Sequence, residues 1–153
     1  QKQGAQMLTI PHFIEFVKYL QNNAVPDKDE LLNEILEKKD PWRSEWLDAY
    51  FIYKNDEMYI AYDHRLVGNT LRPSHTQKLE DCLEEEEYID LMSANSQGLP
   101  TKKVKKQEIY YYPPSKNTIA RFVANSGRAD LYCFGNPSYA DAALGVRAAR
   151  PKN

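Results

Sequence analysis

Long apolar runs are missing from this sequence of 153 residues. No stretch approaches the roughly 18 consecutive apolar residues that a membrane-spanning helix needs, so we expect no membrane span. Hydrophobic residues make up 42% of the chain and charged residues 27%, a balance that is typical of a globular domain. The length suits one domain with a core of its own, and we expect a single domain over residues 1–153.

Metal-binding and redox patterns are also absent. The two cysteines, Cys82 and Cys133, lie 51 positions apart, which is neither a metal-ligand spacing nor a redox pair. Two buried free thiols are the favoured interpretation, while a disulfide stays open. His12, His64 and His75 do not stand at ligand spacing from one another or from a cysteine, so we expect no metal site and no cofactor.

The common sequence motifs of catalysis and phosphate binding are missing as well. The chain has no P-loop, no G-x-G-x-x-G and no G-x-S-x-G. His64 directly follows Asp63, but adjacency alone makes a weak pair, and the carboxylates of Glu84–Glu87 lie in a solvated run. We therefore expect no catalytic residues and no enzyme.

Charge gives no footprint for nucleic acid. The formal net charge is -2, and the basic residues are scattered except for Lys102, Lys103, Lys105 and Lys106. So short a run is more often a solvated loop or the guard of an edge strand than a binding patch. We expect no nucleic-acid partner.

Two amphipathic helices are predicted near the N-terminus. Thr9, with a proline two positions later, is a typical helix start, and apolar residues recur at helical spacing from Phe13 to Leu20. Asp27 and Glu30 form a capping-box pattern before the apolar stripe of Leu31–Leu36. Both stripes indicate packing against a core.

Most of the remaining chain favours short strands. Residues 48–54 and 57–63 predict a hairpin that turns at Asn55 and Asp56, with Trp42 and Trp46 as core anchors before it. Residues 78–91 are less clear, with a helix through Leu79, Cys82 and Leu83 and a strand near Tyr88–Leu91. Further strands are expected within 108–114, 118–124, 129–134 and 143–150. Early helices and late strands predict an α+β fold with a mostly antiparallel sheet.

The C-terminal part of the chain lacks five residue types at once. Residues 121–147, RFVANSGRADLYCFGNPSYADAALGVR, contain no Lys, Glu, Gln, Met or Trp, although the other 126 residues contain 37 of them. At that frequency a window of this length would carry roughly eight. Strands deplete Lys and Glu modestly, but this tendency does not account for the missing Gln, Met and Trp.

The five missing types share a property in the genetic code. Changing the first two bases of an asparagine codon, AAC or AAT, produces every amino acid except these five. Period-2 strand geometry would place Ala129, Leu131 and Cys133 on a fixed inner side and their neighbours on a variable outer side. The candidate variable positions, all reachable in this way, are Asn125, Gly127, Arg128, Asp130, Tyr132, Phe134, Gly135, Asn136, Ser138, Tyr139 and Asp141.

On these residues the chain resembles the variable proteins of diversity-generating retroelements, and among them an archaeal or viral member. The resemblance is carried by residues 121–150, and TIPHFIEFVKYL and PWRSEWLDAYF are compatible with it. ALGVRAAR also resembles the closing strand of the formylglycine-generating branch of the C-type lectin fold. The resemblance implies a C-type lectin-like fold with two helices packed on short strands and the C-terminal strand pairing near the N-terminal one.

In that family, adenine-directed mutagenesis rewrites a C-terminal region, which would here be about 121–147. The resemblance implies that the outer positions form a ligand-binding surface on a constant scaffold, which would include Arg121, Phe122, Leu144, Gly145, Val146 and Arg147. The chain lacks the close cysteine pair of formylglycine-generating enzymes and the E-P-N, Q-P-D and W-N-D motifs of calcium-dependent lectins. Neither oxidase activity nor calcium-dependent sugar binding is therefore implied.

The expected function is that of a receptor-like protein with a hypervariable binding surface. Its partner would be a protein or another cell-surface ligand, its location the cell surface or a virion, and its form a monomer, with other oligomeric states left open. Two alternatives remain: a small enzyme on the same fold, and a structural protein of a phage-like particle.

Overall fold

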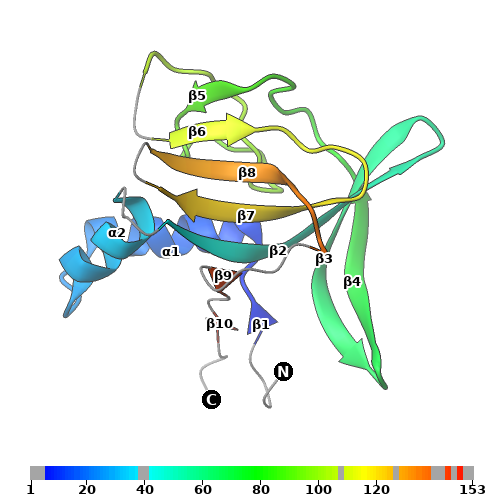
Figure 1. Ribbon diagram of the computed structural model, residues 1–153, viewed down its shortest axis with the longest axis horizontal. Helices are drawn as coiled ribbons and strands as arrows, with labels where there is room; N and C mark the ends of the chain where they lie inside the picture. Colours follow the sequence, from blue (N-terminus) through cyan, green and yellow to red (C-terminus); the bar gives the residue numbers. More distant parts are fainter. Residues whose placement is uncertain are drawn as a thin grey trace.

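The protein has an α+β fold in which two helices lie against one side of a mixed sheet (Figure 1). The structure is a computed structural model. It describes residues 6–37, 42–106, 109–125 and 128–138, together with the backbone of 144–145 and 148–149. The helices are α1 (Ile10–Asn22) and α2 (Lys28–Leu36).

The main sheet has the strand order β4-β3-β2-β7-β8-β6-β5, with β9 (Leu144–Gly145) beside β2. Neighbouring strands are antiparallel except for the pairs β6–β8 and β2–β9, so the expected mostly antiparallel sheet is confirmed. The bounds of the strands are β2 (Arg43–Lys54), β3 (Glu57–Val67), β4 (Thr70–Lys78), β5 (Glu87–Ile89), β6 (Ile109–Tyr112), β7 (Thr118–Ala124) and β8 (Ala129–Gly135).

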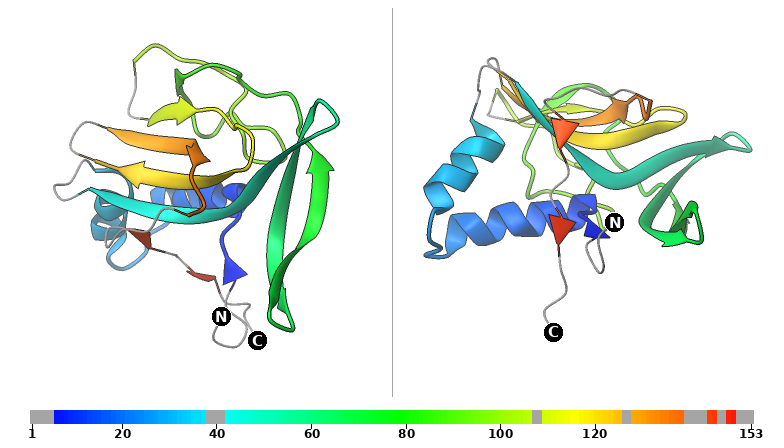
Figure 2. Two further views of the ribbon diagram at one scale, coloured as in Figure 1. Left: turned by 45° about the vertical axis from the view of Figure 1, so that its right-hand side comes forward. Right: turned by 60° about the horizontal axis from the view of Figure 1, so that its bottom comes forward.

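The two ends of the chain meet in a separate two-stranded sheet. Strand β1 (Gln6–Met7) pairs antiparallel with β10 (Ala148–Ala149) below the main sheet (Figures 1 and 2). The expected pairing of the C-terminal strand with the N-terminal one is therefore confirmed.

The core fills the space between α1 and the main sheet, which the right-hand view of Figure 2 shows edge-on. Phe13 of α1 packs on Phe122 of β7, with ring centroids 4.7 Å apart. Leu131 of β8 and Tyr111 of β6 are fully buried beside them. The apolar stripe of α1 is thus core, as predicted, and Ile35 is the buried residue of α2.

Several local predictions are confirmed, because each depended on interactions between residues close together in the sequence. Thr9 caps α1 by accepting a hydrogen bond from the His12 backbone N–H. The hairpin of β2 and β3 turns at Asn55 and Asp56, whose φ values of 52° and 61° suit the left-handed turn that these residue types favour. Strand β6 ends immediately before two prolines, which cannot donate to a ladder.

Three predictions are wrong. Asp27 makes no side-chain cap and has a φ of 60°, so α2 has no capping box. Residues 79–86 form no helix, because distant loop groups take their backbone: Glu80 N–H donates to Gln97, and Leu83 N–H to Pro100. The tryptophans at 42 and 46 are half-buried rather than core anchors.

Strand β4 escaped prediction altogether. All of its nine residues are exposed, so it lacks the apolar alternation that indicates a half-buried strand. It is the edge of the sheet, where Pro73 is tolerated because a proline costs no ladder bond on the open side.

Candidate binding face

Strand β8 divides its side chains between two environments. Ala129, Leu131 and Cys133 are at most 1% exposed and point into the core. Arg128, Asp130, Tyr132 and Phe134 alternate with them and lie on the side of the sheet away from the helices. The predicted inner and outer sets are therefore separated as the period-2 pattern required.

Neighbouring strands extend this outer side into one surface. In register, Tyr132 stands between Arg121 of β7 and Tyr112 of β6, and Trp46 of β2 follows Arg121. Asp130 likewise stands beside Tyr110, which is followed by Tyr88. We call this surface the tyrosine–arginine face, made of Trp46, Tyr88, Tyr110, Tyr112, Arg121, Arg128, Asp130, Tyr132 and Phe134.

Ring contacts run through the face from β5 to β8. Centroids are 4.9 Å apart for Tyr88 and Tyr110, 5.3 Å for Tyr110 and Tyr112, and 4.8 Å for Tyr112 and Tyr132. The edge-on and tilted geometries are those in which aromatic quadrupoles attract. Because each ring is held by its neighbours, the face presents rigid apolar area.

Two arginines stack on these rings. The Arg121 guanidinium lies 4.6 Å from the Tyr132 centroid and 5.7 Å from that of Trp46. Arg128 lies 3.8 Å from the Tyr110 centroid and donates from Nε to Asp130 at 2.8 Å. Cation–π stacking orients the guanidinium of Arg121, and stacking together with the ion pair to Asp130 orients that of Arg128.

Asp130 is outward-facing but not exposed, which corrects the sequence prediction. Only 5% of the residue is accessible, because Arg128 and the tyrosine rings cover it. Burial raises the pKa of the Asp130 carboxyl above its usual value, and the charge of Arg128 partly offsets this. Asp130 therefore supports Arg128 rather than offering itself to a ligand.

Replacing Arg128 by Met should destabilise the fold by an amount that grows with pH. A carboxyl whose folded pKa is raised favours the folded state below its unfolded pKa of about 3.9 and loses that contribution as pH rises through the folded pKa. Without Arg128 the folded pKa rises further, so the deficit should reach about 1–2 kcal/mol by pH 7 after allowing for solvent screening. Urea unfolding of both proteins between pH 4 and 8 measures it.

The control for this experiment is the Asp130→Asn background. There the effect of Arg128→Met should be independent of pH, because stacking on Tyr110 is lost equally at every pH. An equally pH-dependent deficit in that background would show that another group is responsible.

Gly135 is the second correction, because it is buried and faces no solvent. A Cβ at this position would come within 2.5 Å of the Ile119 carbonyl oxygen and 3.2 Å of the Trp46 ring. Phe134, by contrast, is 52% exposed, and Asn136 and Ser138 are exposed beyond it.

The remaining predicted positions have mixed outcomes. Asn125 is half-buried and caps the turn before β8 by accepting from the Arg128 N–H at 3.0 Å. Gly127, Tyr139 and Asp141 lie outside the described residues.

Sequence reasoning missed the platform under the variable positions. Tyr110 and Tyr112 alternate with the core residue Tyr111, and that alternation within a tyrosine run was the available signal. Arg121 was assigned to the scaffold, although its side chain stacks on the face. Trp46 was assigned to the core, because the sequence does not indicate which strand lies beside it.

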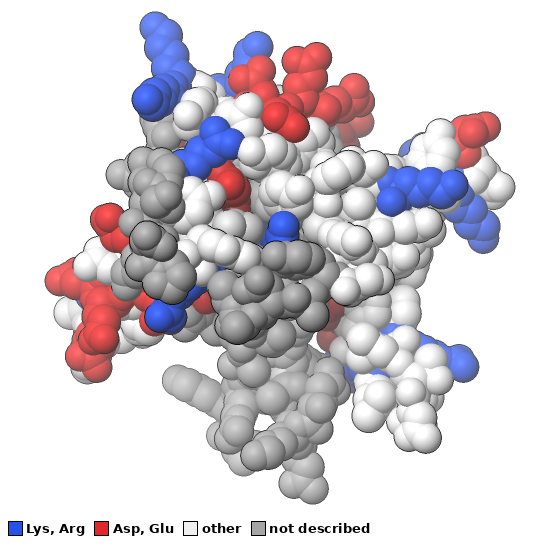
Figure 3. Space-filling model, viewed as in Figure 1, with Lys and Arg blue, Asp and Glu red and all other residues white. Residues whose placement is uncertain are grey.

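The face combines aromatic surface with the few charges of Arg121, Arg128 and Asp130. Figure 3 shows white surface interrupted by a few blue and red patches over the strands at the centre and left of the view, with acidic side chains gathered along the upper edge beyond β6. A surface of this kind suits binding by shape and aromatic contact with a few directed charges.

Within the described residues, no group of three or more His, Cys, Asp or Glu could hold a metal ion, and no helix is long and apolar enough to cross a membrane. Cys82 and Cys133 are free thiols, and burial raises the pKa of each. No protein-family model, curated protein or solved structure matches the chain.

Proposed function

We propose that this protein is a ligand-binding protein whose tyrosine–arginine face is diversified by a retroelement. The proposal includes a C-type lectin-like fold, the absence of enzymatic activity, and a target that is a protein or another cell-surface ligand. The resemblance of residues 121–150 to archaeal and viral members of that family, given above, supports the assignment.

The observation that carries the proposal is the match between a composition and a surface. The window without Lys, Glu, Gln, Met and Trp covers residues 121–124 of β7 and all of β8, whose outward side chains stand at the centre of the face. The flanking strands β2, β5 and β6 lie outside the window and supply Trp46, Tyr88, Tyr110 and Tyr112. A rewritten strand framed by constant aromatic strands is the arrangement that a diversified binding site needs.

The side chains offered by this strand suit recognition rather than turnover. Tyr132 and Phe134 supply contact area that loses little conformational entropy on binding, and Arg128 supplies charge with fixed direction. Asn136 and Ser138 supply adaptable hydrogen bonding at the exposed end of β8. Antibody paratopes use the same residue types for the same reasons.

Sequencing of this gene in many copies from its source population tests the proposal. Substitutions should concentrate at Arg128, Tyr132, Phe134, Asn136 and Ser138, because these residues are exposed or half-buried. The changes should occur at template adenines and should not introduce the five missing types. The buried positions Ala129, Leu131 and Cys133 serve as internal controls and should stay constant.

Variation spread evenly along the gene would refute diversification. Frequent Lys or Glu at the exposed positions would also do so, because adenine-directed change of asparagine codons cannot produce them. The missing residue types would then be a property of strand composition alone.

A further inference from the structure

Asp48 and His64 form a carboxylate–imidazole pair outside the tyrosine–arginine face. One oxygen of Asp48 accepts a hydrogen bond from the His64 backbone N–H at 2.8 Å, and the other contacts Nδ1 of the His64 ring. The side chains are 4% and 18% exposed. Asp63, the sequence neighbour of His64, pairs instead with Arg65 at 3.2 Å.

Two irregularities of the backbone bring this pair together. Strand β2 bulges between Trp46 and Tyr50, and Asp48 lies within the bulge. Asp63, immediately before His64 in β3, has a φ of 54°, which is unusual for a residue inside a strand. Bulges re-aim side chains next to functional sites, and such backbone conformations persist where the surrounding structure enforces them.

The pair lies at a cleft of about 430 Å³. Apart from Asp48 and His64, the described residues that line it are apolar or aromatic and come from several strands, with Met7, Ile52, Leu71 and Ile119 among them. A concave, mostly apolar site with a few polar groups is the usual form of a small-molecule site, and this volume is within the usual range.

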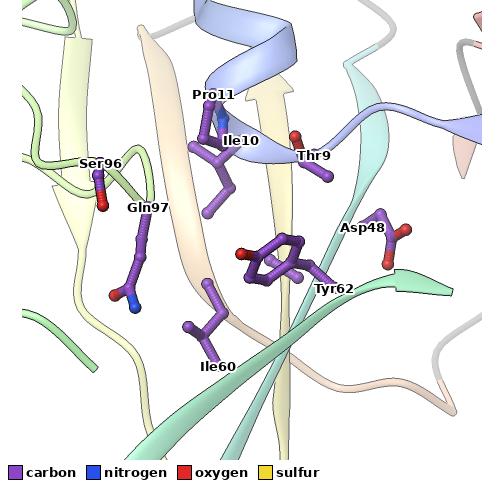
Figure 4. Close-up of a pocket in the computed structure, with 9 residues that line it drawn as sticks. Thr9, Ile10, Pro11, Asp48, Ile60, Tyr62, Ser96 and Gln97 are labelled. Carbon is purple, nitrogen blue, oxygen red and sulfur yellow. The ribbon is translucent and has the colours of Figure 1, made fainter. Parts of the chain in front are cut away.

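Asp48 also lines a small cavity of about 60 Å³ with mixed polar and apolar walls (Figure 4). Figure 4 shows Tyr62 reaching across it, with Thr9 and Asp48 on one side and Ser96 and Gln97 on the other. The volume suits one or two water molecules at about 30 Å³ each. Of the two side chains of the pair, the imidazole is the more exposed, so it is the polar group offered to the cleft.

The carboxylate also determines which hydrogen bond the imidazole can make. Asp48 accepts only, so it fixes the proton of a neutral ring on Nδ1 and leaves a lone pair on Nε2 of His64. Among the described residues, Nε2 has no hydrogen-bond partner. A ligand that meets Nε2 must therefore bring a donor. An anionic group would suit the site poorly, because Asp48 already supplies a negative charge beside the ring.

We propose that this cleft is a second binding site, for a small apolar molecule that carries one hydroxyl group. The apolar body occupies the cleft, and the hydroxyl donates to Nε2 of His64. The inference does not depend on the proposed function, because none of the described residues that line the cleft belongs to the diversified window.

The first experiment compares two probes on the whole protein by titration calorimetry at pH 8. The probes are 4-ethylphenol and 4-ethylanisole, which differ in that methylation removes the hydroxyl proton. One neutral hydrogen bond corresponds to about a 5-fold difference in affinity, so the phenol should bind about 5-fold more tightly. Failure of 4-ethylphenol to saturate, or equal affinity for both probes, would overturn the proposal.

Three variants locate the effect. Asp48→Asn keeps the shape but donates from its amide to Nδ1, which moves the ring proton to Nε2 and should abolish the preference for the phenol. His64→Phe should abolish the same preference while both probes still bind. Leu71→Ala, at a residue that is 58% exposed, should weaken both probes without affecting folding or the preference.

The outcomes remain decisive if Asp48→Asn does not fold, because His64→Phe tests the same hydrogen bond. A phenol preference that survives in His64→Phe would place the probe elsewhere and refute the assignment. Probe binding and gene variation are measured independently, so this inference and the proposed function can fail separately.

Discussion

Leu131→Asp should prevent this domain from folding. Leu131 has no accessible surface and packs in the core beneath α1, with Phe122 opposite it on β7. Domains are typically stable by roughly 5–15 kcal/mol. Burying an unpaired carboxylate there, with loss of the apolar contacts, should cost most of this free energy of unfolding or exceed it. Circular dichroism and thermal unfolding would show the loss of a cooperative transition.

Phe134→Asp is the matched control on the same strand. It also replaces an apolar side chain by a carboxylate, three positions away, where the side chain is 52% exposed on the outer side. A solvated carboxylate costs little, so this variant should stay folded with a change of about 1 kcal/mol or less. Equal destabilisation by both substitutions would contradict the division of β8 into core and binding sides.

The sequence predicted the parts of the fold that depend on local pattern. Period-2 alternation predicted the two sides of β8, and turn chemistry at Asn55 and Asp56 predicted the β2–β3 hairpin. Helical spacing predicted α1, whose Phe13 and Val17 are buried as expected. In each case one segment contained the whole signal.

The remainder depended on partners distant in the sequence. Residues 79–86 look helical by spacing, but the side chain of Gln97 and the carbonyl of Pro100 satisfy their backbone instead. Strand β4 exists because β3 pairs with it, although its own residues are all exposed. Such elements cannot be predicted from their own residues unless the neighbouring strands are known.

The candidate site, too, could be predicted only in part from the sequence. Its variable strand stood out by composition, whereas its platform of Trp46, Tyr110 and Tyr112 required the strand order. The burial of Asp130 under Arg128 likewise followed from the arrangement of three strands. The Asp48–His64 pair joins positions 16 apart through a bulge that periodicity does not reveal.

Gly135→Ala should destabilise the protein although alanine is one of the residues that rewriting an asparagine codon can produce. The added Cβ would lie 2.5 Å from the Ile119 carbonyl oxygen, closer than real Cβ contacts come, and 3.2 Å from the Trp46 ring. The backbone oxygen cannot rotate away as a side chain could, so β7 and β8 must move apart where their register already shifts. Overpacking of this kind costs about 1–3 kcal/mol, and urea unfolding measures it directly.

Asn136→Ala provides the neighbouring comparison, because Asn136 is exposed and its side chain accepts a hydrogen bond from the Ser138 N–H. That substitution should change stability by about 0.5 kcal/mol or less. The same contrast should appear in natural copies of the gene, where position 136 varies and position 135 remains glycine. A stable Gly135→Ala protein, or free variation at position 135, would mean that β7 and β8 are not packed as closely as the 2.5 Å approach requires. The same mutagenesis can change both of these adjacent positions. A difference in their variation among natural copies would therefore come from selection for a folded protein and not from a bias in the mutagenesis.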